Sequence, residues 1–197
     1  VINGERQTGV TTFFLDHDID TGRLIMQLPF DIADEYDVED VYNGLMRQGA
    51  DICLKTLDKI IESDGYPQSI SQDDLIVKCG ELHHAPKIFK ETCMIDWTKN
   101  VKQIYDFIRG LSPYPGAWTT LVSPDNKEVV LKLYKTNKTD ICSDKSVGSI
   151  IINAKKMYVV AQDSLLEVVE LQMAGKKRMT VTDFINGLKN IEEYHVK

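Results

Sequence analysis

The chain has 197 residues, of which 43% are apolar and 27% are charged. This length allows one large domain or two small ones, and the composition excludes wholesale disorder. No apolar run approaches the roughly 20 residues of a membrane-spanning helix, and no basic-then-apolar signal segment is present, so we expect a cytoplasmic protein with no membrane partner.

The net charge of −7 is unevenly distributed along the chain. Residues 1–68 hold 14 acidic and 5 basic side chains, whereas residues 69–197 hold 16 acidic and 18 basic ones. Such asymmetry is typical of a protein of which one part meets a polyanion, although an ordinary solvated surface explains the same counts. The four cysteines show no Cys-x-x-Cys spacing, which favours reduced thiols over a zinc site.

Two short runs rich in β-branched and aromatic residues, 10–15 and 24–28, predict two strands joined by the acidic turn 16–22. Gly22 can take a positive φ, so the chain can turn sharply there. The turn would place Asp20 at the edge of a sheet, where catalytic groups often lie on loops. An acidic solvated turn explains the same residues from composition alone.

Residues 38–61 predict a long helix with Asp37 as its N-cap. Its apolar side chains repeat at three- and four-residue steps, which predicts that one face covers a sheet. That face comprises Val38, Val41, Tyr42, Leu45, Ala50, Leu54, Leu57 and Ile61. Only two strands precede the helix, too few for a stable sheet, so we expect residues 1–68 to be part of a larger domain.

Residues 69–92 lack periodicity and predict a linker. The linker carries basic residues that could face a phosphate backbone, although a solvated connector is the commoner explanation of such a run. These residues are Lys78, Lys87 and Lys90, with His83 and His84 between them.

A second helix is predicted over 99–109, with Thr98 as its N-cap and Gly110 just past its end. Five strand-like runs follow at about ten-residue spacing, which predicts a small closed or nearly closed barrel. They span 118–122, 129–134, 147–152, 157–161 and 165–171, and a last helix begins near 181 with Thr180 as its N-cap.

Three adjacent cations, Lys176, Lys177 and Arg178, lie between the last predicted strand and the last helix. Clustered cations bind phosphates without sequence choice, but a solvated loop gives the same pattern. We expect Trp97, Arg109 and Trp118 to be structural, since large aromatic side chains usually pack into cores.

Several motifs occur in an order that resembles the methionyl-tRNA formyltransferases, a branch of the folate-dependent formyltransferases. These are Thr8-Gly9-Val10-Thr11, Asp16, Asp20-Thr21-Gly22, Ile95-Asp96-Trp97, Ile108-Arg109-Gly110-Leu111, Pro113-Tyr114-Pro115-Gly116-Ala117-Trp118 and Leu171-Gln172-Met173-Ala174-Gly175-Lys176-Lys177-Arg178-Met179. The resemblance runs through nearly the whole chain. Within the formyltransferase superfamily, the Ala-Gly-Lys-Lys segment favours the methionyl-tRNA branch.

The resemblance implies an α+β chain. Residues 1–68 would be the end of a Rossmann-like α/β formyltransferase domain, 69–92 a linker, and 93–197 a small β-barrel of the oligonucleotide-binding kind that holds tRNA. The implied activity is transfer of a formyl group from 10-formyltetrahydrofolate to initiator methionyl-tRNA in translation initiation, without a metal. Asp20 matches the catalytic aspartate, which in this family works with a histidine.

The tRNA-binding residues that follow from this interpretation are Lys87, Lys90, Lys176, Lys177 and Arg178. By position His17 does not match the family histidine, and we expect it to be solvated, with Asp16 and Asp18 stabilising the turn. Arg23 departs from the proline or acid of many relatives, which leaves the shape of the loop open.

The family's Asn-x-His and Ser-Leu-Leu-Pro motifs do not occur in these 197 residues. We therefore expect the chain to be the C-terminal portion of a longer protein and to be inactive on its own. Two alternatives remain open: an RNA-binding barrel without activity, and a nucleotide-sugar formyltransferase. The basic Ala-Gly-Lys-Lys segment and the uneven charge argue against the second alternative.

Overall fold

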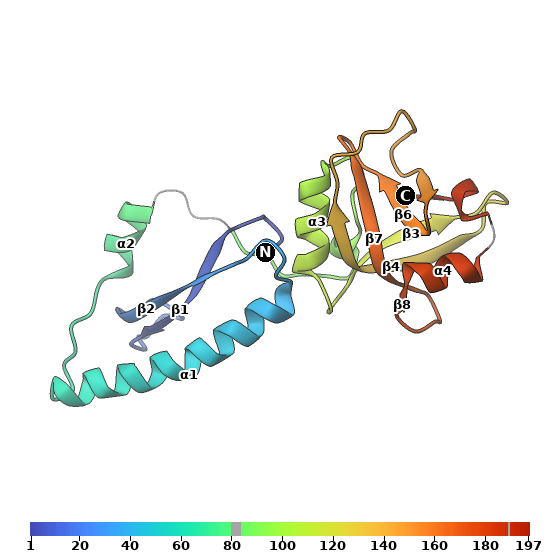
Figure 1. Ribbon diagram of the computed structural model, residues 1–197. Coiled ribbons are helices and arrows are strands. Elements are labelled where there is room, and N and C mark those ends of the chain that lie inside the picture. Colours follow the sequence, from blue (N-terminus) through green and yellow to red (C-terminus); the bar gives the residue numbers. More distant parts are fainter. Residues whose placement is uncertain (80–83, 189) are drawn as a thin grey trace. The chain divides into compact units, whose positions relative to one another are not determined.

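A computed structural model describes residues 1–79, 84–188 and 190–197 (Figure 1). The chain divides into two compact units. The hairpin unit comprises Arg6–Glu35 and Asp40–Lys87, and the sheet unit comprises Val1–Glu5, Tyr36–Glu39 and Ile88–Lys197. The sheet unit is therefore assembled from three separate segments of the chain.

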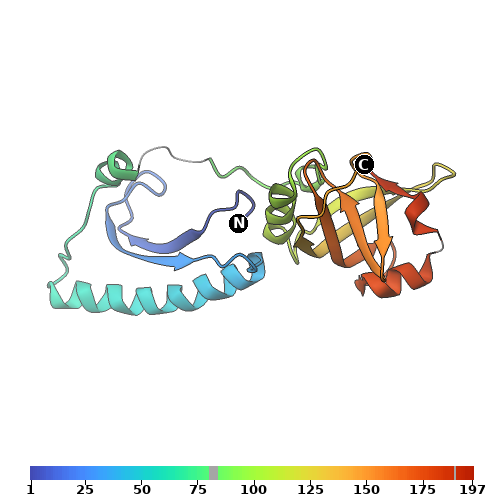
Figure 2. The ribbon, with the colours of Figure 1, turned by 45° about the horizontal axis from the view of Figure 1, so that its top comes forward.

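The hairpin unit is built on two antiparallel strands, β1 (Gln7–Phe13) and β2 (Leu24–Asp31), in which Gln7 lies opposite Asp31. The long helix α1 (Val38–Glu62) runs alongside this hairpin in both ribbon views (Figures 1 and 2). A short helix, α2 (Gln72–Cys79), lies in the segment for which the sequence predicted irregular structure. Its first turn carries acidic residues, as the dipole of a helix favours.

Helix α1 begins as predicted, because the Asp37 carboxylate accepts a hydrogen bond of 2.9 Å from the Glu39 backbone N–H. The predicted buried face is right for Val41 but wrong for most of its other members. The described side chains that α1 buries are Val41, Ile52 and Thr56, and the Thr56 hydroxyl lies 2.8 Å from that of Thr12 on β1.

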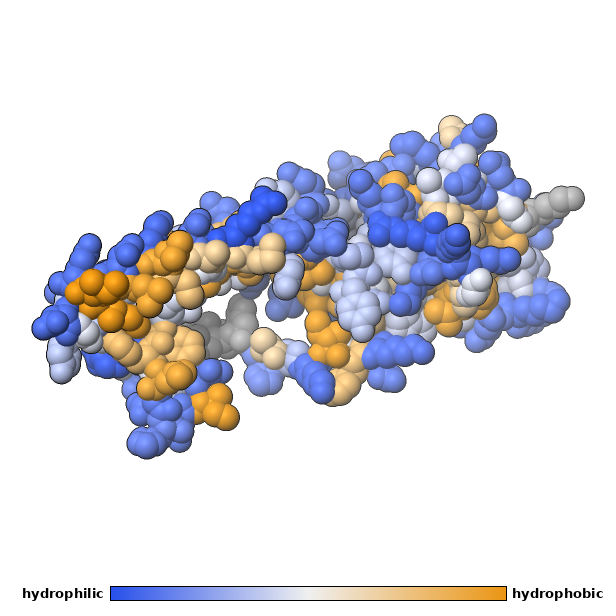
Figure 3. Space-filling view, turned by 90° about the horizontal axis from the view of Figure 1, so that it is seen from below, coloured by the Kyte–Doolittle hydropathy of each residue, from blue (hydrophilic) through white to orange (hydrophobic). Residues whose placement is uncertain are grey.

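Most of the apolar stripe of α1 faces solvent instead. Two strands are too narrow to cover a 25-residue helix around its apolar arc, so the arc beyond the hairpin stays open. Apolar side chains accordingly gather on the surface of the hairpin unit (Figure 3). The exposed large apolar side chains of α1, here called the α1 stripe, are Tyr42, Leu54, Leu57 and Ile61 of the predicted face, together with Met46.

In its described residues, the sheet unit contains seven strands, all in antiparallel pairs, in the order β5-β6-β7-β4-β3-β9 with β8 paired to β7. An isolated bridge between Ser149 and His195 joins the two ends of this order, so the sheet curls round on itself. The strands are β3 (Ala117–Val122), β4 (Glu128–Lys138), β5 (Ile150–Asn153), β6 (Lys156–Val160), β7 (Leu165–Met173), β8 (Met179–Thr180) and β9 (His195–Val196).

Helix α3 (Val101–Gly110) follows the 3-10 turn η1 (Glu91–Cys93), and Asn100 rather than the predicted Thr98 caps it. Asn100 and Gln103 form a reciprocal capping box, which satisfies two backbone N–H groups, whereas Thr98 donates to the Asp96 carboxylate. Gly110 ends the helix instead of following it. A Cβ there would lie 2.6–3.0 Å from Ile2, so glycine is needed for close packing.

Helix α4 (Val181–Gly187) begins as predicted, since the Thr180 hydroxyl accepts a hydrogen bond from the Asp183 backbone N–H. Phe184 is buried, and a 3-10 turn η2 (Ile191–Glu193) leads into β9. No helix in the described part of the chain is both long and apolar enough to span a membrane.

The main hydrophobic core lies in the sheet unit, between α3 and the inner face of the sheet. Trp97 is 4% exposed, and its indole N–H donates to the Thr119 hydroxyl at 3.0 Å, so it is structural as predicted. Arg109 is also buried: its guanidinium binds the Asp106 carboxylate at 2.7 Å and the Tyr36 carbonyl at 2.7 Å. The prediction is only partly right for Trp118, which is half-buried at the surface of the sheet.

Candidate functional site

The acidic turn lies between β1 and β2, where Asp20 has a positive φ of 60°. Aspartate tolerates this left-handed conformation better than most residues. The side chain of Asp20 is exposed, and the Thr21 hydroxyl donates to the Asp18 carbonyl at 3.1 Å across the turn. The turn therefore presents the Asp20 carboxylate to solvent.

Residues after α1 hold this turn in place. The Gln72 side-chain amide, at the start of α2, donates to the carbonyls of Asp20 and Gly22, both at 2.8 Å. The Arg23 guanidinium donates to the Ser69 hydroxyl at 2.9 Å and to its carbonyl at 2.6 Å. Arg23, the departure from the family pattern, thus ties the turn to the start of the predicted linker.

The reason for glycine at position 22 differs from the predicted one. Gly22 does not have a positive φ; instead, a Cβ at this position would lie 1.5 Å from the Phe14 carbonyl oxygen. The two arms of the turn pass too closely for any side chain. The positive φ that the sequence assigned to Gly22 belongs to Asp20.

The other polar residues of the turn are exposed. Asp16 accepts a hydrogen bond of 2.8 Å from the His17 backbone N–H, which supports its predicted role in stabilising the turn. Asp18 contributes its carbonyl oxygen rather than its carboxylate to the turn.

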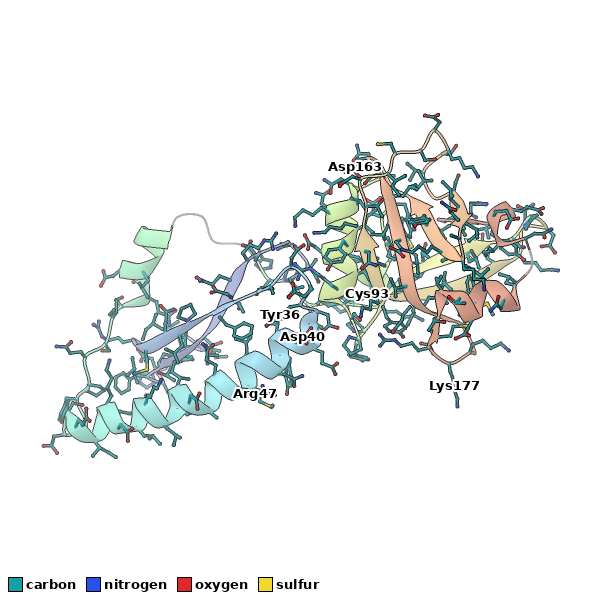
Figure 4. All side chains as sticks on the ribbon, viewed as in Figure 1. Tyr36, Asp40, Arg47, Cys93, Asp163 and Lys177 are labelled. Carbon is teal, nitrogen blue, oxygen red and sulfur yellow. The ribbon has the colours of Figure 1, made fainter. Side chains whose placement is uncertain are left out.

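The basic cluster Lys176, Lys177 and Arg178 lies on the hairpin turn between β7 and β8, just before α4. Gly175 supplies the positive φ of 75° that this turn needs. Lys177 points away from the sheet (Figure 4). Both lysines are exposed, so their ammonium groups are accessible to an anion.

Arg178 differs from the two lysines because it is already paired. Its guanidinium binds the Glu170 carboxylate at 2.5–2.7 Å and stacks 4.5 Å from the centre of the Tyr134 ring. Burial raises the pKa of the Tyr134 phenol, which donates a hydrogen bond of 2.7 Å to the Gln172 side chain. The charge of Arg178 is therefore already paired within the protein, and its side chain contributes mainly to the shape of this surface.

A row of side chains that the sequence analysis missed crosses the outer face of the sheet. Trp118 on β3 lies opposite Lys132 on β4, which lies opposite Gln172 on β7. The Trp118 indole N–H donates to the Lys90 carbonyl at 2.8 Å, and the Gln172 amide donates to the Lys176 carbonyl at 2.8 Å. Only the period-two alternation of β3 and β4 could have indicated this row, since it places these residues opposite the buried ones.

The structure thus brings Lys90 and the basic turn to one face of the sheet. Lys87 is exposed but belongs to the hairpin unit. The side chain of Lys78 and residue His83, which the sequence analysis included in the same basic run, lie outside what the structure describes.

Among the described residues, Cys53, Cys93 and Cys142 form no disulfide, and no group of three potential metal ligands occurs. Burial raises the pKa of the Cys93 thiol, although nearby Lys132 acts in the opposite direction.

Residues 87–189 match the model of the formyl transferase C-terminal domain, and residues 1–57 match the model of the formyl transferase domain. The chain therefore belongs to the formyl transferase family. It is similar to the methionyl-tRNA formyltransferase of Parabacteroides distasonis, with 51% identity over 197 residues, and to that of Bacteroides thetaiotaomicron, with 46% identity over 195 residues. These alignments cover 100% and 98% of the chain and 60% of each relative.

Solved structures share the fold at much lower identity. HypX from Aquifex aeolicus in complex with tetrahydrofolic acid aligns over 98% of this chain and 32% of its own, with a TM-score of 0.65 and 16% identity. An N-formyltransferase from Helicobacter canadensis, in complex with folinic acid and dTDP-3-aminofucose, aligns over 90% of this chain and 58% of its own, with a TM-score of 0.55 and 18% identity.

Proposed function

We propose that the protein to which these residues belong transfers a formyl group from 10-formyltetrahydrofolate to the amino group of methionyl initiator tRNA, in the cytoplasm, for translation initiation. The observation that carries this proposal is the 51% identity, over the whole chain, to a relative of that name. The exposed lysines on the outer face of the sheet support it, because RNA binding needs accessible cations.

In this proposal the two ends of the chain have different tasks. Residues 1–68 form the end of a Rossmann-like catalytic domain, 69–92 connect, and 93–197 hold the tRNA. The antiparallel order of the seven strands and the Ser149–His195 bridge support a small barrel of the oligonucleotide-binding kind for the last part.

Asp20 is the proposed catalytic residue. Its carboxylate would orient a histidine and stabilise the positive charge that forms on that histidine as it takes up a proton. The fixed turn supports this role, because the Gln72 amide binds the Asp20 carbonyl and the Arg23 guanidinium binds the Ser69 carbonyl. The residues present do not make a folate site by themselves, since Asp20 stands exposed and the family's folate motif is not among them.

A chimera tests the activity directly. The first part of the P. distasonis relative, up to the residue that aligns with Val1, would be joined to this chain and assayed with 10-formyltetrahydrofolate. We expect formylation of methionyl initiator tRNA by the chimera and none by the 197 residues alone. Formylation of a dTDP-amino sugar instead of tRNA would favour the nucleotide-sugar alternative.

Asp20→Asn in the chimera should lower kcat by two orders of magnitude or more, roughly the effect of removing a group that positions a catalytic histidine. Asp18→Asn is the matched control, because it changes an acid of the same turn that makes no side-chain hydrogen bond to the turn's backbone in the described structure. Equal activity of the two variants would contradict the role of Asp20.

The 197-residue chain itself tests tRNA binding. Lys176→Ala together with Lys177→Ala should weaken binding of initiator tRNA and flatten its dependence on salt by roughly one to two units of slope. Lys55→Ala with Lys59→Ala, two exposed lysines on α1, is the matched control. If both pairs behave alike, the basic turn is not the tRNA site.

A further inference from the structure

A pocket of about 440 Å³ opens on the sheet unit between the segment that leads into η1 and strands β3 and β4. Its volume lies in the range of roughly 300–1,000 Å³ that is usual for small-ligand sites. Three aromatic side chains line it, Phe89, Tyr114 and Trp118, and no acidic residue does so among those described there. Cys93 forms part of the lining close to the sheet (Figure 4).

Trp118 is held in place at this pocket from both sides. Its indole N–H donates to the Lys90 carbonyl, and its backbone carbonyl accepts a hydrogen bond of 2.8 Å from the Ile95 N–H. A fixed aromatic ring is a ready stacking surface, because little conformational entropy is lost when a second ring packs on it. Tyr114 is 83% exposed at the same pocket.

Two cations, Lys90 and Lys132, line the same pocket. The Lys132 ammonium donates one hydrogen bond, of 2.8 Å, to the Pro115 carbonyl, and an ammonium group has three N–H donors. Gly116 allows this approach, because a Cβ there would already lie 3.3 Å from the Lys132 side chain. The described lining of the pocket therefore carries a net positive charge, and Lys132 keeps two N–H donors beyond the one bonded to Pro115.

The pocket also lies close to the basic turn. Lys132, which lines the pocket, lies opposite Gln172 on the adjacent strand, one strand spacing or about 5 Å away, and the Gln172 amide donates to the Lys176 carbonyl of the turn. A strand of a few nucleotides can therefore contact both the pocket and the turn. Aromatic rings beside cations are the arrangement by which proteins hold unpaired nucleotides.

We propose that this pocket binds one unpaired nucleobase of an RNA strand, stacked on Trp118 and Tyr114, with the flanking phosphates on Lys90 and Lys132. The inference rests on the proposed function, since it specifies how the sheet unit holds RNA. The positive lining favours a polyanion over an apolar peptide segment, which would gain nothing from the two ammonium groups.

Binding of labelled RNA to the 197-residue chain tests the proposal. The probes are a single-stranded hexanucleotide, a blunt RNA duplex and initiator tRNA, each followed by fluorescence anisotropy. Tyr114→Ala should weaken binding of the hexanucleotide about five- to hundredfold, the usual effect of losing one stacking partner, and leave the duplex within about twofold. Tyr66→Ala is the matched control, because Tyr66 is 88% exposed and lies in the hairpin unit.

Tryptophan fluorescence gives a second measurement that does not depend on a drastic substitution. The chain has two tryptophans, and Trp97 is buried, so quenching by the hexanucleotide should come from Trp118 and vanish in Trp118→Phe. Quenching by an uncharged apolar peptide but not by RNA would overturn the inference in favour of a protein partner.

The outcomes separate the inference from the proposed function. If Tyr114→Ala binds the hexanucleotide as the wild-type chain does, while Lys176→Ala with Lys177→Ala still weakens tRNA binding, the pocket is not a base site and the tRNA proposal stands. If the wild-type chain binds none of the three RNA probes, both fail.

Discussion

The two units of this chain use similar apolar content in opposite ways. In the sheet unit, helix α3 buries Ile104 and Ile108 against a sheet of seven strands. In the hairpin unit, helix α1 is more than twice as long but has two strands to pack on, and it leaves Leu54, Leu57 and Ile61 between 54% and 76% exposed. An amphipathic sequence pattern therefore predicts that a helix has an apolar face, but it does not predict whether other elements bury that face.

The largest difference between the two units should appear in the rates of amide hydrogen exchange. Opening of β4 and β7 requires loss of the main core, whereas β1 and β2 can separate with little loss of buried area. We expect the amides of β4 and β7 to exchange about a thousandfold more slowly than those of β1 and β2. Equal protection in mass-spectrometric exchange would mean that the hairpin unit is as stable as the sheet unit.

Two leucine-to-alanine substitutions, one in each unit, compare the contributions of a buried and an exposed leucine to stability. Leu171 on β7 is 0% exposed, so Leu171→Ala should lower the free energy of unfolding by about 2–5 kcal/mol, through lost transfer energy and a cavity. Urea unfolding followed by tryptophan fluorescence reports on it, since both tryptophans lie in the sheet unit. Leu57→Ala removes the same atoms from the exposed α1 stripe. The free energy of opening of α1, measured by hydrogen exchange, should change by no more than about 0.5 kcal/mol.

Removal of a helix N-cap should have a smaller effect on stability. Asn100→Ala removes the side chain that accepts the Gln103 N–H, so the sheet unit should lose about 1 kcal/mol of stability. Asn43→Ala, at an exposed position in the second turn of α1, should cause no loss of stability, because alanine has the higher helix propensity. A loss in Asn43→Ala as large as that in Asn100→Ala would argue against the capping box.

The smallest predicted effect depends on pH. Hydrogen bonds from the Thr98 hydroxyl and backbone N–H lower the pKa of Asp96. A lowered folded-state pKa stabilises the protein above the unfolded-state pKa, near about 4, and this contribution is lost as the pH falls through the folded-state value. Between pH 6 and pH 3, the wild-type chain should therefore lose slightly more stability than Thr98→Ala in urea titrations. A larger loss in the variant would contradict the role of Thr98 in lowering the pKa of Asp96.

Local signals in the sequence predicted the elements well where the deciding contacts are local. The N-caps Asp37 and Thr180, the start of α1 and five strands of the sheet unit follow from residues within a few positions of each other. The sequence placed the cap of α3 two residues early, because Thr98 and Asn100 are both good caps and only Gln103 completes a reciprocal box.

The features that the sequence analysis missed depend on contacts between distant residues. The local sequence predicts a turn conformation for Gly22, whereas glycine is required there because the Phe14 carbonyl passes too close for a Cβ. The row of Trp118, Lys132 and Gln172 requires the register of three strands, which no single segment specifies. Asp20 and the basic turn were found because residue type and family resemblance mark them, and their roles stay predictions.

The contact between Arg109 and the Tyr36 carbonyl has a practical consequence for protein engineering. A truncated protein that starts at residue 93 would discard Tyr36 and Ile2, although both contribute to the sheet unit. The guanidinium would lose one of its acceptors, and the surface at Gly110 would lose the residue that covers it. Anyone who wishes to express or transplant the sheet unit should therefore join Val1–Glu5 and Tyr36–Glu39 to the remainder of the unit through designed loops rather than cut the chain once.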